Sequence, residues 1–223
     1  MTSGKTVIIA IDGPAAAGKG TLGARLAEKY RLAKLDTGLL YRATGFKVAS
    51  GGGDPEDSEA AEAAAKALDP AELANPALRG DEAAQAASKV SAIPGVRAAL
   101  LDFQHQFAQN PPNLADESPA QGAILDGRDI GTTVCPDADA KLFVTASTEV
   151  RAERRFKELQ ERGHEAIYAR VLEDMKERDA RDSNRSASPL VAADDALVLD
   201  TSDLDADQAF AAAVAFISSK NLF

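Results

Sequence analysis

Residues 9–21, IAIDGPAAAGKGT, combine a glycine-rich turn with a lysine at a spacing that suits the binding of phosphate groups. Gly13 and Gly18 enclose four residues, and Lys19 follows directly. Glycines allow backbone N–H groups to turn inward around an anion, and the amino terminus of a following helix adds partial positive charge. A strand-to-helix turn that binds nothing is the alternative, and the lysine disfavours it. The predicted nucleotide-binding residues are Gly13, Pro14, Ala15, Ala16, Ala17, Gly18, Lys19, Gly20 and Thr21.

Gly20 stands where the common form of this loop carries a hydroxyl that ligates magnesium. Thr21 lies one residue further, about 100° around a helix, and can still donate to a phosphate. We therefore expect no direct protein ligand for Mg²⁺, which phosphate oxygens and water would hold. The G-x-x-x-x-G-K-G-T pattern resembles the nucleoside monophosphate kinase branch of phosphate-loop proteins. The chain has neither an N-K-x-D nor a D-x-x-G motif, which disfavours a GTPase switch.

Two further motifs, LDTGLLYR (35–42) and ILDGRDIGT (124–132), each end a predicted strand and enter a helix or turn. The first offers Asp36, Thr37 and Arg42, and the second offers Asp126, Arg128 and Asp129. Ligands gather at the carboxyl ends of strands in parallel α/β sheets. An arginine such as Arg42 or Arg128 is ordinarily solvated at the surface. Two of them at strand ends, in an acidic protein with a phosphate loop, favour a second anion site.

The segment from 151 to 185 contains eight arginines. Arg178, Asp182 and Arg185 are spaced so that a continuous helix would place all three on one face, with Arg181 on an adjacent strip. These arginines are the candidates for phosphate binding. The earlier ones interleave with glutamates, which is typical of a solvated, ion-paired helix face. The arginines assigned to that face are Arg151, Arg154, Arg155 and Arg162.

The elements that must position these residues follow from the apolar pattern. Short apolar runs predict strands at 7–11, 123–125, 141–146 and 196–199, with a weaker fifth at 33–38. Helical periodicity lies between them, as in Leu22, Leu26 and Tyr30, and in Val96, Leu100, Phe103 and Phe107. Alternating strands and helices predict an α/β fold, with a parallel five-stranded sheet and helices on both faces.

Two segments fall outside this sheet pattern. Residues 51–87 are rich in Ala, Glu and Asp and are interrupted by Gly and Pro, which predicts short surface helices with turns. Residues 149–189 are densely charged and helical, with a thin apolar stripe of Ile167, Val171 and Met175. We expect a single domain, 1–223, carrying two excursions: an Ala-rich helical one over 38–100 and an arginine-rich lid over 150–189.

Composition excludes several classes of protein. The net charge of −10 disfavours nucleic acid and anionic membranes as partners. One cysteine, Cys135, permits no internal disulfide, and one cysteine with two histidines disfavours a zinc site. No stretch approaches the ~20 apolar residues of a membrane span, and the amino-terminal apolar run is too short for a signal peptide. We expect a cytoplasmic protein, and nothing in the sequence demands a partner, so we expect a monomer.

Five motifs in this order and spacing together resemble the bacterial cytidylate kinases: DGPAAAGKGT, LDTGLLYR, AASKVSAIPGVR, LDGRDIGT and ERDARDSNRSASPL. The resemblance covers nearly all of the chain except 51–77. It implies transfer of the γ-phosphoryl group of ATP, with Mg²⁺, to CMP or dCMP. The 38–100 excursion would then bind the nucleoside monophosphate. Longer members of the family carry a β-rich insert before the segment of Ser88, where this chain is Ala-rich.

Site residues follow from the resemblance by position. It implies catalytic roles for Lys19, Arg128, Arg178 and Arg185, which would neutralise charge on the phosphates. Asp182 would bind the ribose hydroxyls, and Thr37, in place of the usual Ser, would lie beside the monophosphate. The residues implied in CMP binding are Thr37, Arg42, Ser88, Arg97, Arg128, Asp129, Arg178, Asp182 and Arg185, with Ser88, Arg97 and Asp129 reading the cytosine.

Two alternatives remain open at the level of sequence. One is a phosphate-loop kinase with another acceptor, such as UMP, AMP or a small alcohol. The other is a regulatory module that binds a nucleotide and transfers nothing, which would not need Arg42, Arg128 and Arg185 to converge.

An acceptor phosphate is already anionic at neutral pH, so the kinase requires no general base. His105 and His164 are accordingly expected at the surface.

Overall fold

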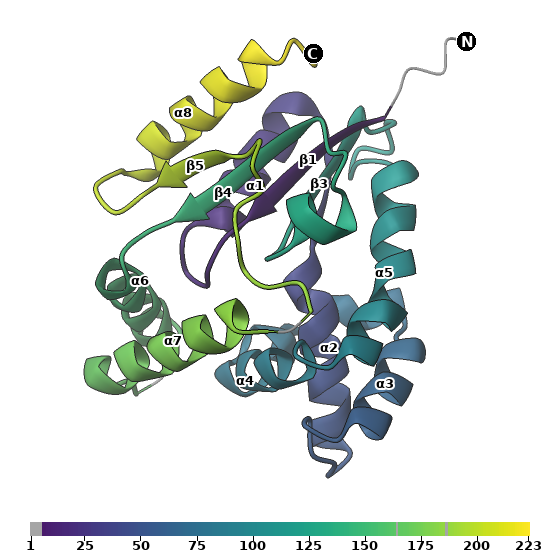
Figure 1. The fold of residues 1–223 in the computed structure, drawn as a ribbon, viewed down its shortest axis with the longest axis vertical. Coiled ribbons are helices and arrows are strands. Elements are labelled where there is room, and N and C mark those ends of the chain that lie inside the picture. Colours follow the sequence, from purple (N-terminus) through teal and green to yellow (C-terminus); the bar gives the residue numbers. More distant parts are fainter. Residues whose placement is uncertain (1–5, 164, 186) are drawn as a thin grey trace. The chain divides into compact units, whose positions relative to one another are not determined.

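The computed structural model describes residues 6–163, 165–185 and 187–223 (Figure 1). His164, expected at the surface, lies outside these residues. The chain divides into two compact units. We call the first, residues up to Leu35 together with 108–223, the sheet unit, and the second, Asp36–Phe107, the helical unit.

The sheet unit is built on five strands in the order β2-β3-β1-β4-β5. Strand β1 lies at the centre and pairs in parallel with both β3 and β4, and β4 pairs in parallel with β5. The predicted five-stranded parallel α/β sheet is therefore confirmed. The strands are β1 Val7–Asp12, β2 Ala33–Asp36, β3 Gly122–Asp126, β4 Ala140–Thr145 and β5 Leu197–Asp200.

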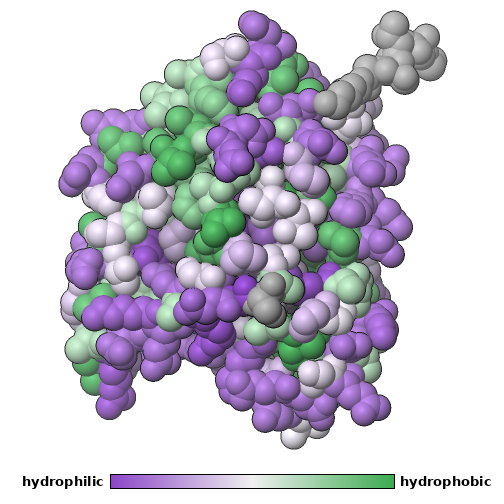
Figure 2. Space-filling view, viewed as in Figure 1, coloured by the Kyte–Doolittle hydropathy of each residue, from purple (hydrophilic) through white to green (hydrophobic). Residues whose placement is uncertain are grey.

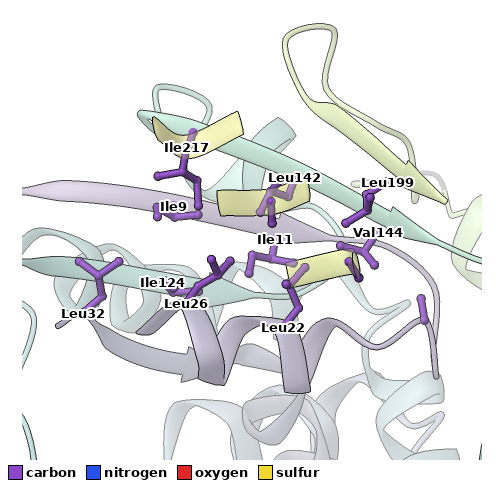
Figure 3. Packing of buried hydrophobic residues seen from close by; sticks show 14 residues of the cluster. Ile9, Ile11, Leu22, Leu26, Leu32, Ile124, Leu142, Val144, Leu199 and Ile217 are labelled. Carbon is purple, nitrogen blue, oxygen red and sulfur yellow. The ribbon is translucent and has the colours of Figure 1, made fainter. Parts of the chain in front are cut away.

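Helices pack on both faces of this sheet. On one face, side chains from β1, β3, β4 and β5 meet those of α1 (Lys19–Tyr30) and α8 (Ala206–Ser219) in one buried cluster (Figure 3). Each buried Leu or Ile in such a cluster contributes about 1.5–3 kcal/mol. On the opposite face lies η3 (Ile130–Val134), a single π-helical turn whose Gly131 packs against the side chain of Lys141.

Two more helices of the sheet unit, α6 (Thr148–Glu161) and α7 (Tyr168–Ser183), form the arginine-rich segment. Val171 and Met175 are buried, as the apolar stripe predicts, but Ile167 is 57% exposed and precedes the helix. A continuous helix through Arg185, which would place it on one face with Arg178 and Asp182, does not form. Helix α7 ends at Ser183, because Ser and Asn favour turns over helix interiors, and Arg185 follows its end.

The helical unit contains the Ala-rich segment, and every regular element described over 51–87 is helical, as expected. Small side chains allow its helices to approach closely, since a Cβ added to Gly45 of α2 would lie only 2.8 Å from the Cβ of Ala86 in α4. Its elements are α2 Thr37–Ser50, α3 Ser58–Lys66, η1 Pro70–Ala74, η2 Pro76–Arg79, α4 Asp81–Val90 and α5 Pro94–Gln109, which runs two residues into the sheet unit.

Hydrophilic residues cover most of the face shown in Figure 2, and hydrophobic residues form small groups between them. In the described part of the chain, no helix is both long and apolar enough to cross a membrane. Cys135 is buried beside the turn that follows η3.

Candidate functional site

The glycine-rich loop connects the end of β1 to the start of α1, as predicted. Gly13 has a φ of 141°, and a Cβ there would overlap the backbone carbonyl of Val144, so position 13 accepts only glycine. Gly18 is the N-cap of α1, with a φ of 92° and no side-chain hydrogen bond to the first turn. The N–H groups at the start of α1 therefore have no capping side chain, and an anion can bind them.

Lys19 is buried against its own loop, where its Nζ donates to the carbonyl oxygen of Pro14 at 2.8 Å. Gly20 is exposed, and a Cβ there would lie 3.8 Å from Oδ2 of the buried Asp126. The position of the missing hydroxyl thus faces a carboxylate at the end of β3. Among the described residues, no group of three or more His, Cys, Asp and Glu side chains could hold a metal ion.

Three predicted arginines gather around one buried carboxylate in the sheet unit. Nε of Arg128 donates to Oδ2 of Asp182 at 3.2 Å, and the side chain of Asp182 is 5% exposed. Burial alone would raise the pKa of Asp182. The positive charges of Arg128, Arg178 and Arg185 outweigh burial and hold this pKa below its ordinary value. These three guanidinium groups bring several positive charges close together, which suits an anionic ligand.

Arg185 joins this cluster although it follows the end of α7. Its Nε donates to the backbone carbonyl of Asp182 at 3.2 Å, and the residue is buried. The same carbonyl accepts the N–H of Leu190 at 3.0 Å, which ties the segment after the helix back onto it. Arg181 is half-buried on the last turn of α7.

Arg151 contradicts its predicted place on a solvated face, because it is buried at the start of α6. Its guanidinium binds both carboxylate oxygens of Asp179 on α7, at 3.0 and 2.5 Å, and donates to the carbonyl of Ala15 in the phosphate loop at 3.3 Å. Nε donates to the carbonyl of Ala146 at 2.9 Å. Arginine can occupy such a place because its planar fork serves several acceptors at once.

The other three arginines of that predicted face differ among themselves. Arg155 and Arg162 both form the expected ion pair, with Glu158, at 3.0 and 2.6 Å. Of these two, only Arg162 is exposed as predicted, because the side chain of Arg155 is just 14% exposed. Arg154 is half-buried too, and its guanidinium donates to Oγ1 and to the carbonyl oxygen of Thr201 at 2.9 and 2.6 Å.

A cavity of about 310 Å³ opens beside the phosphate loop within the sheet unit. Its wall includes Gly18 and Thr21 of the loop and helix start, the apolar Leu22 and Leu204, and Arg154. This volume and this largely apolar lining with a few polar groups are typical of small-ligand sites. Sequence reasoning missed this cavity, since its walls come from four distant segments.

Asp12 and Asp129 are both buried near the start of η3. Asp12, the last residue of β1, accepts the N–H groups of Ile130 and Gly131, each at 2.7 Å. Burial raises the pKa of Asp12 to about 6, although these two hydrogen bonds and Lys19 act in the opposite direction. Asp12 was not among the residues predicted from the sequence. The available signal was an acidic residue that ends an otherwise apolar strand directly before the loop.

The remaining predicted residues lie in the helical unit. Arg42 donates to the carbonyls of Leu78 and Gly80, at 2.8 and 3.4 Å, and so ties α2 to the end of η2. Arg97 donates to the carbonyl of Ser91 at 3.2 Å and lies over the ring of Tyr41, 5.5 Å from its centre. Thr37, the first residue of α2, and Ser88, on α4, are both buried.

Comparison with known proteins agrees with the motifs. The family model described as cytidylate kinase matches residues 9–219. The cytidylate kinase of Paramagnetospirillum magneticum is 66% identical over 215 residues, which are 96% of this chain and 99% of that protein. The cytidylate kinase of Rhodospirillum rubrum is 58% identical, with the same coverage of both chains.

A solved structure of an uncharacterised protein from Eubacterium ventriosum shares the fold. It has a TM-score of 0.55 at 13% identity and covers 96% of this chain and 99% of its own. The sequence matches extend over the phosphate loop, both strand-end motifs and the arginine-rich helices. The chain therefore belongs to the cytidylate kinase family.

Proposed function

We propose that this protein transfers the γ-phosphoryl group of ATP, which arrives with Mg²⁺, to CMP or dCMP and releases CDP or dCDP. The observation that carries the proposal is the arginine cluster around Asp182, in the same compact unit as an uncapped phosphate loop. The loop supports donor binding, and the positive charges of the three arginines support an anion being transferred or accepted.

On the donor side, the N–H groups of the loop and Lys19 bind the β- and γ-phosphates. The adenine enters the cavity beside the loop, with the guanidinium of Arg154 along its wall. Mg²⁺ is bound by phosphate oxygens and water, as this ion prefers. Asp126, buried beside Gly20, is suited to accept a hydrogen bond from such a water.

On the acceptor side, Asp182 binds the ribose hydroxyls, and Thr37 and Arg42 bind the monophosphate. Asp129, Ser88 and Arg97 read the cytosine. A carboxylate accepts from the exocyclic amine of cytosine, whereas uracil would place a carbonyl oxygen against it. One such base-edge pairing is worth about 1–3 kcal/mol, so we expect CMP to be preferred over UMP by tenfold or more.

The chemistry needs no general base, because the attacking phosphate oxygen is already anionic. Catalysis therefore consists of alignment and charge neutralisation by Lys19, Arg128, Arg178 and Arg185. Helices α6 and α7 act as a lid that excludes water, which would otherwise hydrolyse ATP. We further propose a monomeric, cytoplasmic protein. The net charge of −10 supports the proposal that neither nucleic acid nor an anionic membrane is its partner.

The test is a panel of CMP, dCMP, UMP and AMP with labelled ATP and Mg²⁺. We expect phosphorylation of CMP and dCMP at least tenfold faster than of the others. Faster phosphorylation of another nucleotide would identify that nucleotide as the acceptor in place of CMP or dCMP. Binding of ATP without transfer to any of them would favour the regulatory module.

Arg185→Ala tests the role of the cluster. We expect kcat to fall by about 10²–10³, as when one preorganised donor to a developing charge is lost, while the Kd of ATP changes less than about threefold. Arg162→Ala, which removes an exposed partner of Glu158, is the matched control and should keep wild-type kcat. Equal losses in kcat and ATP affinity in the Arg185 variant would contradict a transition-state role.

A further inference from the structure

Asp12 connects two motifs that are far apart in the sequence. It directly precedes Gly13, the first residue of the phosphate loop, and its side chain reaches η3, more than a hundred residues later. Oδ1 accepts the N–H of Ile130 and Oδ2 accepts the N–H of Gly131. These are the first two residues of η3, and they directly follow Arg128 and Asp129.

The start of η3 depends on this contact. The first N–H groups of a helical turn have no partner within the turn. The N-cap residue, Asp129, does not cap them with its side chain. Both oxygens of Asp12 supply these hydrogen bonds from β1. Only the ionised carboxylate offers an acceptor oxygen to each N–H, because a protonated carboxyl or an amide replaces one acceptor with a donor.

The ionised carboxylate of Asp12 is buried, and burying a charge costs free energy. Asp12 is 5% exposed, and burial raises its pKa to about 6. Four charged or titratable side chains surround it: Lys19 at the start of α1, Asp129 before η3, Cys135 after η3, and Lys141 on β4, whose stem flanks Gly131. Asp129 disfavours the charge and Lys19 favours it. A buried acid that served packing alone would be replaced by an apolar residue at a gain in stability.

We propose that Asp12 is a positioning residue for phosphoryl transfer, whose ionised carboxylate fixes η3 to the start of the phosphate loop and thereby orients Arg128 and Asp129 toward Lys19. This inference rests on the proposed function of the site. Protonation removes one acceptor and loosens η3, so alignment of the acceptor should decline as the pH falls. ATP binding, which depends on the loop itself, should change little.

Asp12→Asn tests the proposal by removing the charge at constant shape. We expect kcat with CMP at pH 7.5 to fall at least tenfold, while the Kd of ATP stays within about threefold. The control is Asp139→Asn, because the carboxylate of Asp139 also accepts a backbone N–H, in this case that of Ile8 at 3.0 Å, near the opposite end of β1 from Asp12. The control should retain wild-type kinetics, and equal loss in both variants would overturn the proposal.

The pH profile separates positioning from simple structural support. The phosphate of CMP itself titrates near pH 6, so one acid limb belongs to the substrate. In a plot of log kcat/KM for CMP against pH, the wild type and Asp139→Asn should fall below pH 6 with a slope approaching two. Asp12→Asn should fall with a slope of one. A slope that Asp12→Asn leaves unchanged would overturn the proposal, because a merely structural role would lower stability without moving the profile.

A second readout requires no activity. Amide hydrogen exchange, corrected for its intrinsic pH dependence, should show the N–H groups of Ile130 and Gly131 about tenfold less protected in Asp12→Asn than in the wild type at pH 7.5. In the wild type, their protection should fall between pH 7.5 and 5. Unchanged protection would refute the contact between Asp12 and η3. Changed protection in a protein that phosphorylates no nucleotide would instead refute the proposed function.

Discussion

Asp12 and Asp182 are both buried carboxylates of the sheet unit, 5% and 3% exposed, yet their pKa values move in opposite directions. Burial raises the pKa of Asp12 to about 6, and two backbone N–H groups with one lysine do not compensate for it. Asp182 experiences the same kind of burial, but three guanidinium groups hold its pKa below the ordinary value. Burial therefore does not decide the charge of a carboxylate here, and the number of full positive charges around it does.

The two carboxylates consequently give the site two different kinds of support. The cluster around Asp182 keeps one charge state throughout the physiological range. The contact between Asp12 and η3 is sensitive to pH just below neutrality. Measurements of stability as a function of pH can separate the two, because their contributions have opposite signs.

The largest effect is expected for Asp182→Asn. Removing the charge leaves three neighbouring guanidinium groups without their shared counter-ion, which typically costs about 3–5 kcal/mol of unfolding free energy. The folded pKa of Asp182 is lowered, so its contribution is fully present above the ordinary value of 3.8 and is lost only as the pH falls through the folded pKa. Urea unfolding should therefore show a constant loss between about pH 5 and pH 8.

Added inorganic phosphate should restore part of this stability, since an oxyanion can replace the missing charge among the arginines. Asp207→Asn, which removes an 88% exposed partner of Arg25, is the control and should cost less than about 1 kcal/mol. A loss of similar size in both variants would show that the arginines do not depend on Asp182.

The next effect is a gain in stability on replacing Asp12 by Asn. The folded pKa of Asp12 is raised from 3.8 to about 6, so the folded protein binds this proton more tightly than the unfolded chain. Its contribution is fully present below pH 3.8 and falls by about 3 kcal/mol as the pH rises through 6. Asparagine does not titrate, but it leaves one N–H without an acceptor, which costs about 1 kcal/mol of unfolding free energy.

Asp12→Asn should therefore be about 2 kcal/mol more stable than the wild type at pH 7.5, and this advantage should disappear near pH 4. Paired urea titrations at the two pH values measure it. A constant difference between the variants at all pH values would show that Asp12 does not titrate in this range. Higher stability with lower activity would be the expected trade-off at a functional site.

The features of this molecule that could be predicted from the sequence are those contained within short stretches of the chain. The strands, the phosphate loop and the arginines of the cluster all lie in short motifs, whose periodicity or spacing can be counted. Arg185 lies beside Asp182 although helix α7 ends two residues before it. The chain turns back onto Asp182 after the helix, while the role of Arg185 in phosphate binding stays a prediction.

Contacts between distant segments explain what could not be predicted. Arg151 lies among glutamates in the sequence, so local pattern favours a solvated face. It is buried because Ala15, Ala146 and Asp179 converge on it from three separate segments. The partners of Asp12 are likewise on η3, and no periodicity connects them to β1. Such contacts exist only once the sheet has formed, and single-sequence reasoning has no access to them.

The smallest effect is expected for Arg151→Lys. This variant tests whether the region of Asp182 and the region of Asp12 are coupled through the phosphate loop. Arg151 binds Asp179 on the helix of Asp182 and also the carbonyl of Ala15 in the loop that follows Asp12. Lysine keeps the charge but loses the fork, so we expect a loss of about 1–2 kcal/mol in unfolding free energy. Because the loop loses one support, the KM for ATP should rise several-fold with a smaller change in kcat.

The control is Arg155→Lys, whose arginine contacts Glu158 on its own helix, and it should leave KM unchanged. An unchanged KM in both variants would mean that α7 and the loop are positioned independently, and that the two regions act separately.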